Sequence, residues 1–66
     1  MRLIIKMAGG FFRNVQWDDG KPTIRTSPHK YDAWYTNRMF DALRVAEKLG
    51  GQVMEFNPFN GDLKAA

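Results

Sequence analysis

The first third of the chain alternates short apolar segments with turn-forming residues. Residues 2–7 (RLIIKM) are rich in β-branched and long apolar side chains and precede Ala-Gly-Gly, which predicts a strand that ends in a tight turn. A second strand is expected after the glycine pair, and residues 17–22 (WDDGKP) predict a second turn. Residues 23–26 (TIRT) predict a short third strand, so this part of the chain is expected to form hairpins.

A helical period follows in the second half of the chain. At about 100° per residue, one face collects Met39, Ala42, Leu43, Ala46 and Leu49, with Phe40 and Val45 beside it. Thr36 or Asn37 is expected to cap the start of this helix, because a hydroxyl or amide oxygen accepts hydrogen bonds from unpaired amides. The Gly50–Gly51 pair predicts its end.

The segments after the helix complete the expected fold. Residues 52–56 (QVMEF) predict a closing strand, residues 57–62 (NPFNGD) a turn, and residues 63–66 (LKAA) a frayed end. The order ββ(β)αβ predicts an α+β fold: a small, mostly antiparallel sheet of three or four strands with one helix packed on one face.

The chain is expected to form a single domain over residues 1–66. Hairpins and a basic loop are expected in residues 1–31, the helix and closing strand in residues 32–56, and a turn with a flexible tail in residues 57–66. One helix covers only one face of a small sheet, so the other face is expected to be open to solvent or to a partner.

Alternation along the first two strands assigns side chains to these two faces. Leu3, Ile5 and Met7 are expected to face the helix. On the second strand the more apolar alternate set is expected to do the same: Phe11, Arg13, Val15 and Trp17. The open face then carries basic, amide and aromatic side chains: Arg2, Lys6, Phe12, Asn14, Gln16 and Arg25.

Composition limits the classes of protein that remain. A chain of 66 residues with 44% hydrophobic and 14% aromatic residues has enough apolar surface for one compact core. The chain contains no cysteine, which excludes disulfide bonds and thiolate metal sites. Its apolar runs are too short for a signal peptide or a membrane span, so we expect a soluble, cytoplasmic protein that does not bind membranes.

Positive charge is concentrated in the N-terminal half. Residues 1–30 hold six basic and two acidic side chains, a net charge of +4, whereas residues 31–66 hold four basic and five acidic side chains, a net charge of −1. Such asymmetry is typical of a surface that meets a polyanion or an acidic protein.

One hypothesis is therefore direct binding of nucleic acid by the open face. Aromatic side chains stack on bases and basic side chains contact phosphates. The candidate residues are Arg2, Lys6, Phe12, Arg13 and Arg25. Two observations count against it. The segment GGFFRNVQW does not match the RNA-recognition signature, and a domain this small needs most of its aromatic side chains in the core.

Catalytic chemistry has little support in the sequence. Ser27, His29 and Asp32 lie close together along the chain, but in a proline-containing loop rather than on a rigid scaffold. Ser27 is the only serine and His29 the only histidine, and the carboxylates show no metal-ligand spacing. We predict no catalytic residues, no metal site and no cofactor.

The segment DAWYTNRMFDALRVAEKLGGQVMEF, residues 32–56, resembles small proteins of bacteriophages and mobile elements. Shared features are an extended Asp-Ala-x-aromatic lead, a threonine before an alanine-rich helix, and a Gly-Gly pair before a closing strand. With the opening strand and hairpin, the resemblance covers about residues 2–56. It implies a small binding protein that inhibits or redirects a host protein, including defence nucleases, and it identifies no functional residues.

The leading hypothesis is a non-enzymatic interaction protein, plausibly phage-encoded, that binds a host protein such as a nucleic-acid enzyme. Trp34 and the basic loop over residues 18–31 are the candidate contact region, because tryptophan is enriched at binding hot spots. The candidate partner-binding residues are Trp34, Lys21, Arg25, His29 and Lys30. A third hypothesis is a homodimer joined through an exposed strand edge, so both monomer and homodimer remain open.

Overall fold

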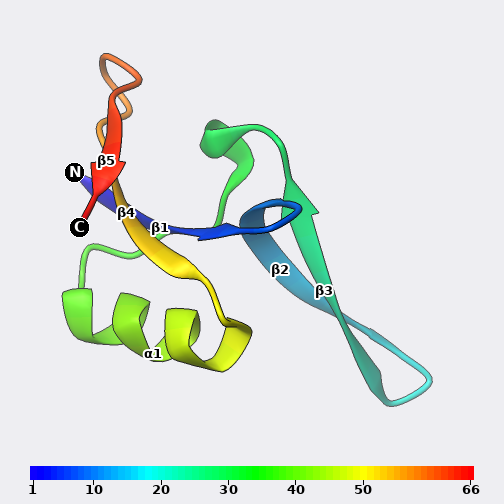
Figure 1. The fold of residues 1–66 in the computed structure, drawn as a ribbon. Coiled ribbons are helices and arrows are strands. Elements are labelled where there is room, and N and C mark those ends of the chain that lie inside the picture. Colours follow the sequence, from blue (N-terminus) through cyan, green and yellow to red (C-terminus); the bar gives the residue numbers. More distant parts are fainter.

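The computed structural model describes residues 1–66 and contains a five-stranded sheet with one α-helix (Figure 1). The sheet order is β3-β2-β1-β4-β5 and all neighbouring strands are antiparallel. This confirms the α+β class with a single helix. The elements are β1 (Arg2–Met7), β2 (Gly10–Asp18), β3 (Lys21–Ser27), the 3₁₀ helix η1 (Lys30–Asp32), α1 (Met39–Leu49), β4 (Gln52–Phe56) and β5 (Leu63–Ala65).

The fifth strand corrects the expectation of a frayed C-terminal tail. Leu63 pairs with Phe56 and Lys64 with Glu55, whose side chains also form an ion pair at 3.4 Å. The turn before β5 is held by its own asparagines: Asn57 Oδ1 accepts from the Phe59 amide and Asn60 Oδ1 from the Asp62 amide. These bonds reverse the chain tightly enough for the last residues to pair with β4.

A small core lies between the sheet and α1. Its buried side chains are Leu3, Ile5, Phe12, Ala42, Ala46 and Val53. The helix contributes alanines, so it packs close to the sheet, and its buried face is rotated from the predicted one. Met39 and Leu43 were expected in the core, but they are 41% and 54% exposed.

Phe12 faces the helix, which corrects its assignment to the open face. Phe11 is paired with Lys6, so these two side chains share the face away from the helix, and Phe12 points the other way. A β-bulge between Phe12 and Asn14 then shifts the alternation, because an extra residue on one strand reverses the side on which the next residues emerge. Val15 therefore lies on the helix side, as expected. Phe12 lies on the same side, although strict alternation would place these two residues on opposite faces.

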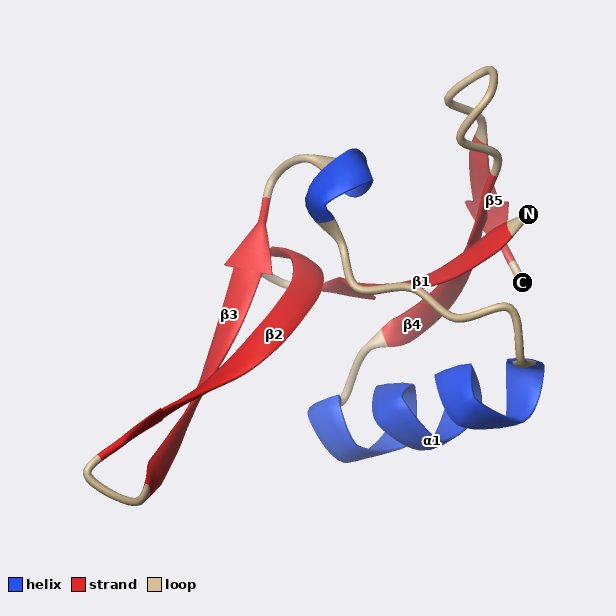
Figure 2. Ribbon diagram, turned by 180° about the vertical axis from the view of Figure 1, so that it is seen from behind, coloured by secondary structure: helices blue, strands red, loops and turns tan.

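The second face of the sheet is not open to solvent. Ile4 and Phe56 are fully buried there beside Ala33. The Tyr31 ring meets the Phe56 ring edge-on at 4.9 Å, and the Lys30 ammonium donates a hydrogen bond to the Gly61 carbonyl. Residues 30–33, which include η1, thus cover this face, and the connection after η1 runs beside β1 in Figure 2.

Residues 33–36 also separate β2 from β1. β1 and β2 pair only at Lys6–Phe11 and Met7–Gly10. Beyond that point Leu3 exchanges two backbone hydrogen bonds with Thr36, at 2.8 and 3.1 Å, and the Trp34 amide donates to the Phe12 carbonyl at 2.9 Å. Residues 33–36 therefore supply hydrogen-bond partners for the backbone groups of β1 that β2 leaves unpaired.

The rest of β2 and most of β3 form a two-stranded ribbon, residues 13–26, that projects from the body (Figures 1 and 2). Every residue of the ribbon is exposed, and the molecule measures 39 Å along its longest axis against 23 and 18 Å. Asp19 and Gly20 have positive φ values of 51° and 78°, as a type I′ hairpin turn requires. The predicted basic loop over residues 18–31 is therefore largely strand and turn.

The two ends of α1 differ in how well the sequence predicts them. The left-handed cap at Gly50 is confirmed, with its amide bonded to the Ala46 carbonyl. At the start, Arg38 is the cap residue and makes no side-chain cap bond, whereas the Thr36 hydroxyl accepts from the Arg38 amide ahead of the helix. With 11 residues α1 is the longest helix, and no helix is long and apolar enough to cross a membrane.

Gly51, which follows α1, packs closely against β1, and this contact leads to a prediction about stability. A Cβ on Gly51 would lie 2.6 Å from Ile5 Cγ2 and 2.9 Å from the Lys6 carbonyl oxygen. Gly51→Ala is expected to lower the free energy of unfolding by about 1–3 kcal/mol, because backbone atoms must move to admit the methyl group. Gly9→Ala is the control, since its Cβ would meet only Thr26 Oγ1 at 3.6 Å. Urea unfolding followed by circular dichroism measures both, and equal stabilities would contradict the packing described.

Candidate functional site

The ribbon has one apolar and one polar face. Cross-strand neighbours share a face, and two pairs, Val15–Ile24 and Trp17–Pro22, make up the apolar ribbon face. The exposed fractions are 39% for Val15, 46% for Ile24 and 67% for Trp17. These side chains are large hydrophobic groups left in water on a segment that is separate from the core.

The polar ribbon face carries the alternate residues: Asn14, Gln16, Asp18, Lys21, Thr23 and Arg25. The Arg25 guanidinium donates to Gln16 Oε1, and Gln16 Nε2 donates to Asp18 Oδ1 at 3.4 Å. Three polar side chains are therefore linked across this face.

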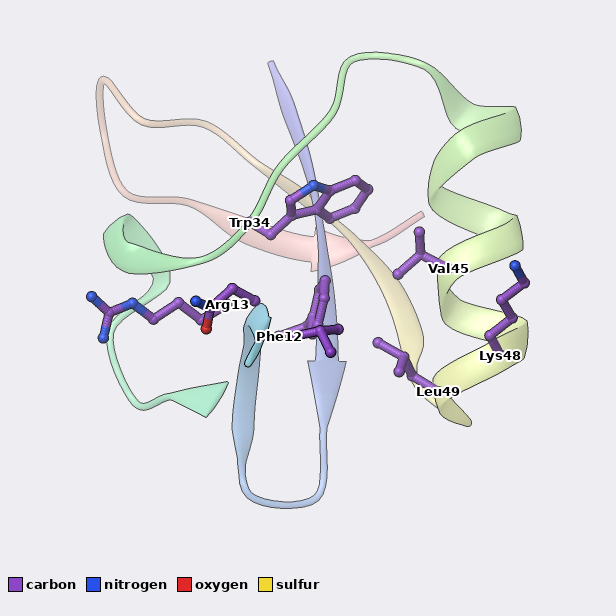
Figure 3. Close-up of a pocket in the computed structure, with 8 residues that line it drawn as sticks. Phe12, Arg13, Trp34, Val45, Lys48 and Leu49 are labelled. Atoms are coloured by element: carbon purple, nitrogen blue, oxygen red, sulfur yellow. The ribbon is translucent and has the colours of Figure 1, made fainter. Parts of the chain in front are cut away.

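A groove lies where the base of the ribbon meets the helix, with a volume of about 440 Å³ (Figure 3). The Trp34 and Phe12 rings, with centroids 5.8 Å apart, lie on one side, and Val45 and Leu49 of α1 lie opposite. Val15 also lines the groove, which makes the groove continuous with the apolar ribbon face. We call these five side chains the groove residues.

The rim of the groove is basic. Lys48 lines the groove and, together with Arg44 and Asp41, also lines a smaller hollow beside Trp34. The one ion pair in the chain joins Lys64 to Glu55, so Lys48 and Arg44 have no ion-pair partner. An occupant with an apolar group next to carboxylates would pack the apolar group in the groove and pair the carboxylates with the basic side chains of the rim.

The structure does not bring the predicted partner-binding residues onto one surface. Trp34 lines the groove but is half-buried rather than exposed, and Lys21 and Arg25 lie on the polar ribbon face. The Lys30 ammonium is occupied by the Gly61 carbonyl and lies 5.6 Å from the centre of the Phe56 ring, and the His29 amide donates to Ser27 Oγ.

The predicted nucleic-acid residues are also dispersed. Phe12, the aromatic residue of that set, is only 7% exposed and belongs to the core, so its ring is not free to stack on a base. The Arg2 guanidinium lies over the Tyr35 ring at 4.1 Å, and Lys6 is exposed on β1. Arg13, on the ribbon, lines the groove, but its guanidinium extends away from it (Figure 3). Arg25 lies on the polar ribbon face.

The Ser27 and His29 pair has a local structural role. Ser27 is 5% exposed, and its Oγ accepts the His29 backbone amide at 3.1 Å, which stabilises the turn before η1. No group of three or more histidine, aspartate or glutamate side chains lies close enough together to hold a metal ion.

Sequence reasoning missed several residues of this site: Val45, Lys48 and Leu49 in the groove, and Trp17 and Ile24 on the ribbon. The available signal was the alternation that places Val15 and Trp17 together on one strand, opposite Ile24 and Pro22 on the next. Finding the groove also required knowing that β2 leaves the sheet, which depends on contacts between distant segments.

No family model, curated protein or solved structure matches this chain. The function is therefore inferred from the surface of the molecule. Its most distinctive feature is a basic-rimmed apolar groove that continues onto a projecting apolar face.

The two tryptophans are expected to differ in their contributions to stability. Trp34→Ala removes a half-buried ring packed on Phe12 and should lower the free energy of unfolding by about 2–3 kcal/mol. Trp17→Ala removes a ring that is 67% exposed and should change it by less than about 0.5 kcal/mol. Urea unfolding of dilute protein followed by far-ultraviolet circular dichroism measures both. A large effect of Trp17→Ala in dilute protein would show that this ring packs within its own chain.

Proposed function

We propose that this chain is a protein-interaction module that binds a partner protein through the groove and the apolar ribbon face. The observation that carries the proposal is the continuity of these two surfaces through Val15. Exposed apolar patches of this kind mark interaction sites, and a tryptophan such as Trp17 is a frequent anchor of protein interfaces.

The exposure of the ribbon supports a partner on energetic grounds. Only 10 of the 66 residues are buried, so the core of the isolated chain is small. Complete burial of a side chain such as Ile24 stabilises a protein by about 1.5–3 kcal/mol relative to leaving it exposed. The exposed side chains of the ribbon do not contribute most of this free energy in the isolated chain. Binding of a protein to the apolar ribbon face recovers it.

The proposed partner is a host protein, and the proposed effect is modulation or inhibition of it. The resemblance to small bacteriophage proteins supports this, as does the basic rim at Arg44 and Lys48. Enzymes of nucleic-acid metabolism, defence nucleases among them, are the proposed class, with binding in the host cytoplasm. An acidic substrate-binding surface on such an enzyme would complement the rim.

The polar ribbon face supports a second candidate function, direct binding of nucleic acid. Asn14, Gln16 and Arg25 emerge from one face of a two-stranded ribbon, and the DNA major groove admits such a ribbon. Amide and guanidinium groups are also the side chains that pair with base edges. Against this, the tip of the ribbon carries Asp18 and Asp19, which phosphates repel.

A matched pair of variants tests the leading proposal. Val15→Glu places a charge on the apolar ribbon face beside the groove, whereas Thr23→Glu places the same charge on the opposite face of the same ribbon. In a tagged pull-down from nuclease-treated bacterial lysate, Val15→Glu should reduce the recovered partner at least about tenfold, a loss of about 1.4 kcal/mol. Thr23→Glu should recover it as the unmodified protein does. Equal recovery with both variants would contradict binding through this surface.

The nucleic-acid candidate has a separate outcome. Binding to a DNA duplex should weaken at least about tenfold from low to moderate salt, because phosphate contacts release counterions. Arg25→Gln should weaken it further, whereas Val15→Glu, on the other face, should have less effect. Fluorescence anisotropy of a labelled duplex measures both. Absence of binding at low salt would remove this candidate.

A further inference from the structure

We propose that a second copy of this chain fills the groove, by inserting the tip of its ribbon. In the resulting two-fold dimer, Trp17 of each copy lies among the groove residues of the other, and Asp19, in the turn at the tip, meets the basic rim. The inference rests on the proposed function only in that the groove accepts a segment of protein.

The chemistry of the tip matches the chemistry of the groove. Trp17 is 67% exposed and is followed by Asp18 and Asp19, neither of which has an ion-pair partner in the chain. The groove is lined by apolar side chains and bordered by Lys48 and Arg44, which also have no ion-pair partner. An aromatic side chain followed by a carboxylate in the turn, that of Asp19, therefore has a complementary site on the same molecule.

The tip cannot fill the groove of its own chain. Val15 already lines that groove, and Trp17 lies two residues farther along the same extended strand, about 7 Å away. Within one chain β2 runs outward from the body of the molecule to the hairpin turn, as Figures 1 and 2 show. The occupant of the groove must therefore come from another molecule.

Two ribbons can stack antiparallel with their apolar faces in contact. In this arrangement the groove of each copy receives Trp17 of the other. If the two-fold axis passes at the level of Gln16, Trp17 of each copy lies opposite Val15 of the other, at the mouth of its groove. Stacked sheets lie about 10 Å apart, a separation that interdigitated side chains fill. Because the interface uses the same surface on both copies, it closes as a dimer and leaves no free groove for a third chain.

This arrangement differs from pairing through an exposed strand edge. Both strands of the ribbon have a free edge. β3 carries Lys21, Pro22 and Arg25, and β2 carries Arg13 at a β-bulge, features that discourage edge-to-edge pairing. The apolar ribbon face has no such protection. The face, and not the edge, is therefore the expected contact.

Sedimentation equilibrium over a wide range of protein concentration tests the dimer. The unmodified chain should reach the mass of two copies as the concentration rises, and Trp17→Ala should raise the dimer dissociation constant at least about tenfold. Trp17 is mostly exposed in the single chain, so circular dichroism of this variant should be unchanged. Thr23→Glu, on the polar ribbon face, is the matched control and should dimerise normally. A monomer at every concentration, or a dimer insensitive to Trp17→Ala, would overturn the proposal.

A charge-reversal cycle tests the contact between tip and rim. Asp19→Lys and Lys48→Asp should each raise the dissociation constant about tenfold, through like charges brought together. The double variant carries both reversals in each copy and should return to within about threefold of the unmodified protein. Asp19 has a positive φ of 51°, which lysine adopts less readily than aspartate, so the first variant also loosens the hairpin. Rescue by Lys48→Asp cannot arise from that effect. Failure of the rescue would overturn the ion-pair contact.

The two proposals fail in different ways. If the protein stays monomeric while Val15→Glu still abolishes capture of a partner, the second copy is wrong as the occupant and the interaction function stands. If the protein dimerises through Trp17 and no other protein is captured in a Val15-dependent manner, self-association stands and the proposed binding of a host protein fails.

Discussion

The arrangement depends on the backbone pairing of residues 34–36 with the edge of β1. The two hydrogen bonds between Leu3 and Thr36, with a third from Trp34 to Phe12, fill the edge of β1 that β2 leaves free. Buried backbone groups need partners, so β2 is able to leave the sheet only because this segment replaces it. The same insertion brings Trp34 against Phe12 and so forms one wall of the groove. Fold and candidate site therefore share one cause.

The division between core and ribbon follows from the small size of the chain. α1 presents Ala42 and Ala46 to the sheet, which permits a close approach but buries little area. The second face of the sheet is closed by the connection from η1, with Tyr31 packed on Phe56. These two layers complete the body of the molecule. The remaining large apolar side chains, Trp17 among them, have no place in it and remain on the surface.

Local patterns in the sequence predicted the elements better than their arrangement. The hairpin turn at Asp18–Asp19–Gly20 and the left-handed cap at Gly50 are short-range features, and both are present. Strict alternation from Val15 and Trp17 assigns Phe12 to the opposite face, and this is wrong because the β-bulge between Phe12 and Asn14 shifts the phase. No local pattern marks that bulge. The groove joins side chains from β2, α1 and the segment between them. Its formation depends on contacts across long sequence separations, and a periodicity within one element cannot supply these.

The position of the ribbon outside the core has a consequence for how the sequence can change. Residues 13–26 are all exposed, so most substitutions there leave the packing of the body intact. Affinity and specificity can then vary by mutation in one hairpin while folding is conserved by another part of the chain. The molecule is in this sense a natural display scaffold. Hairpins of other sequence, joined after Phe12 and before Ser27, are a direct route to engineering new recognition on it.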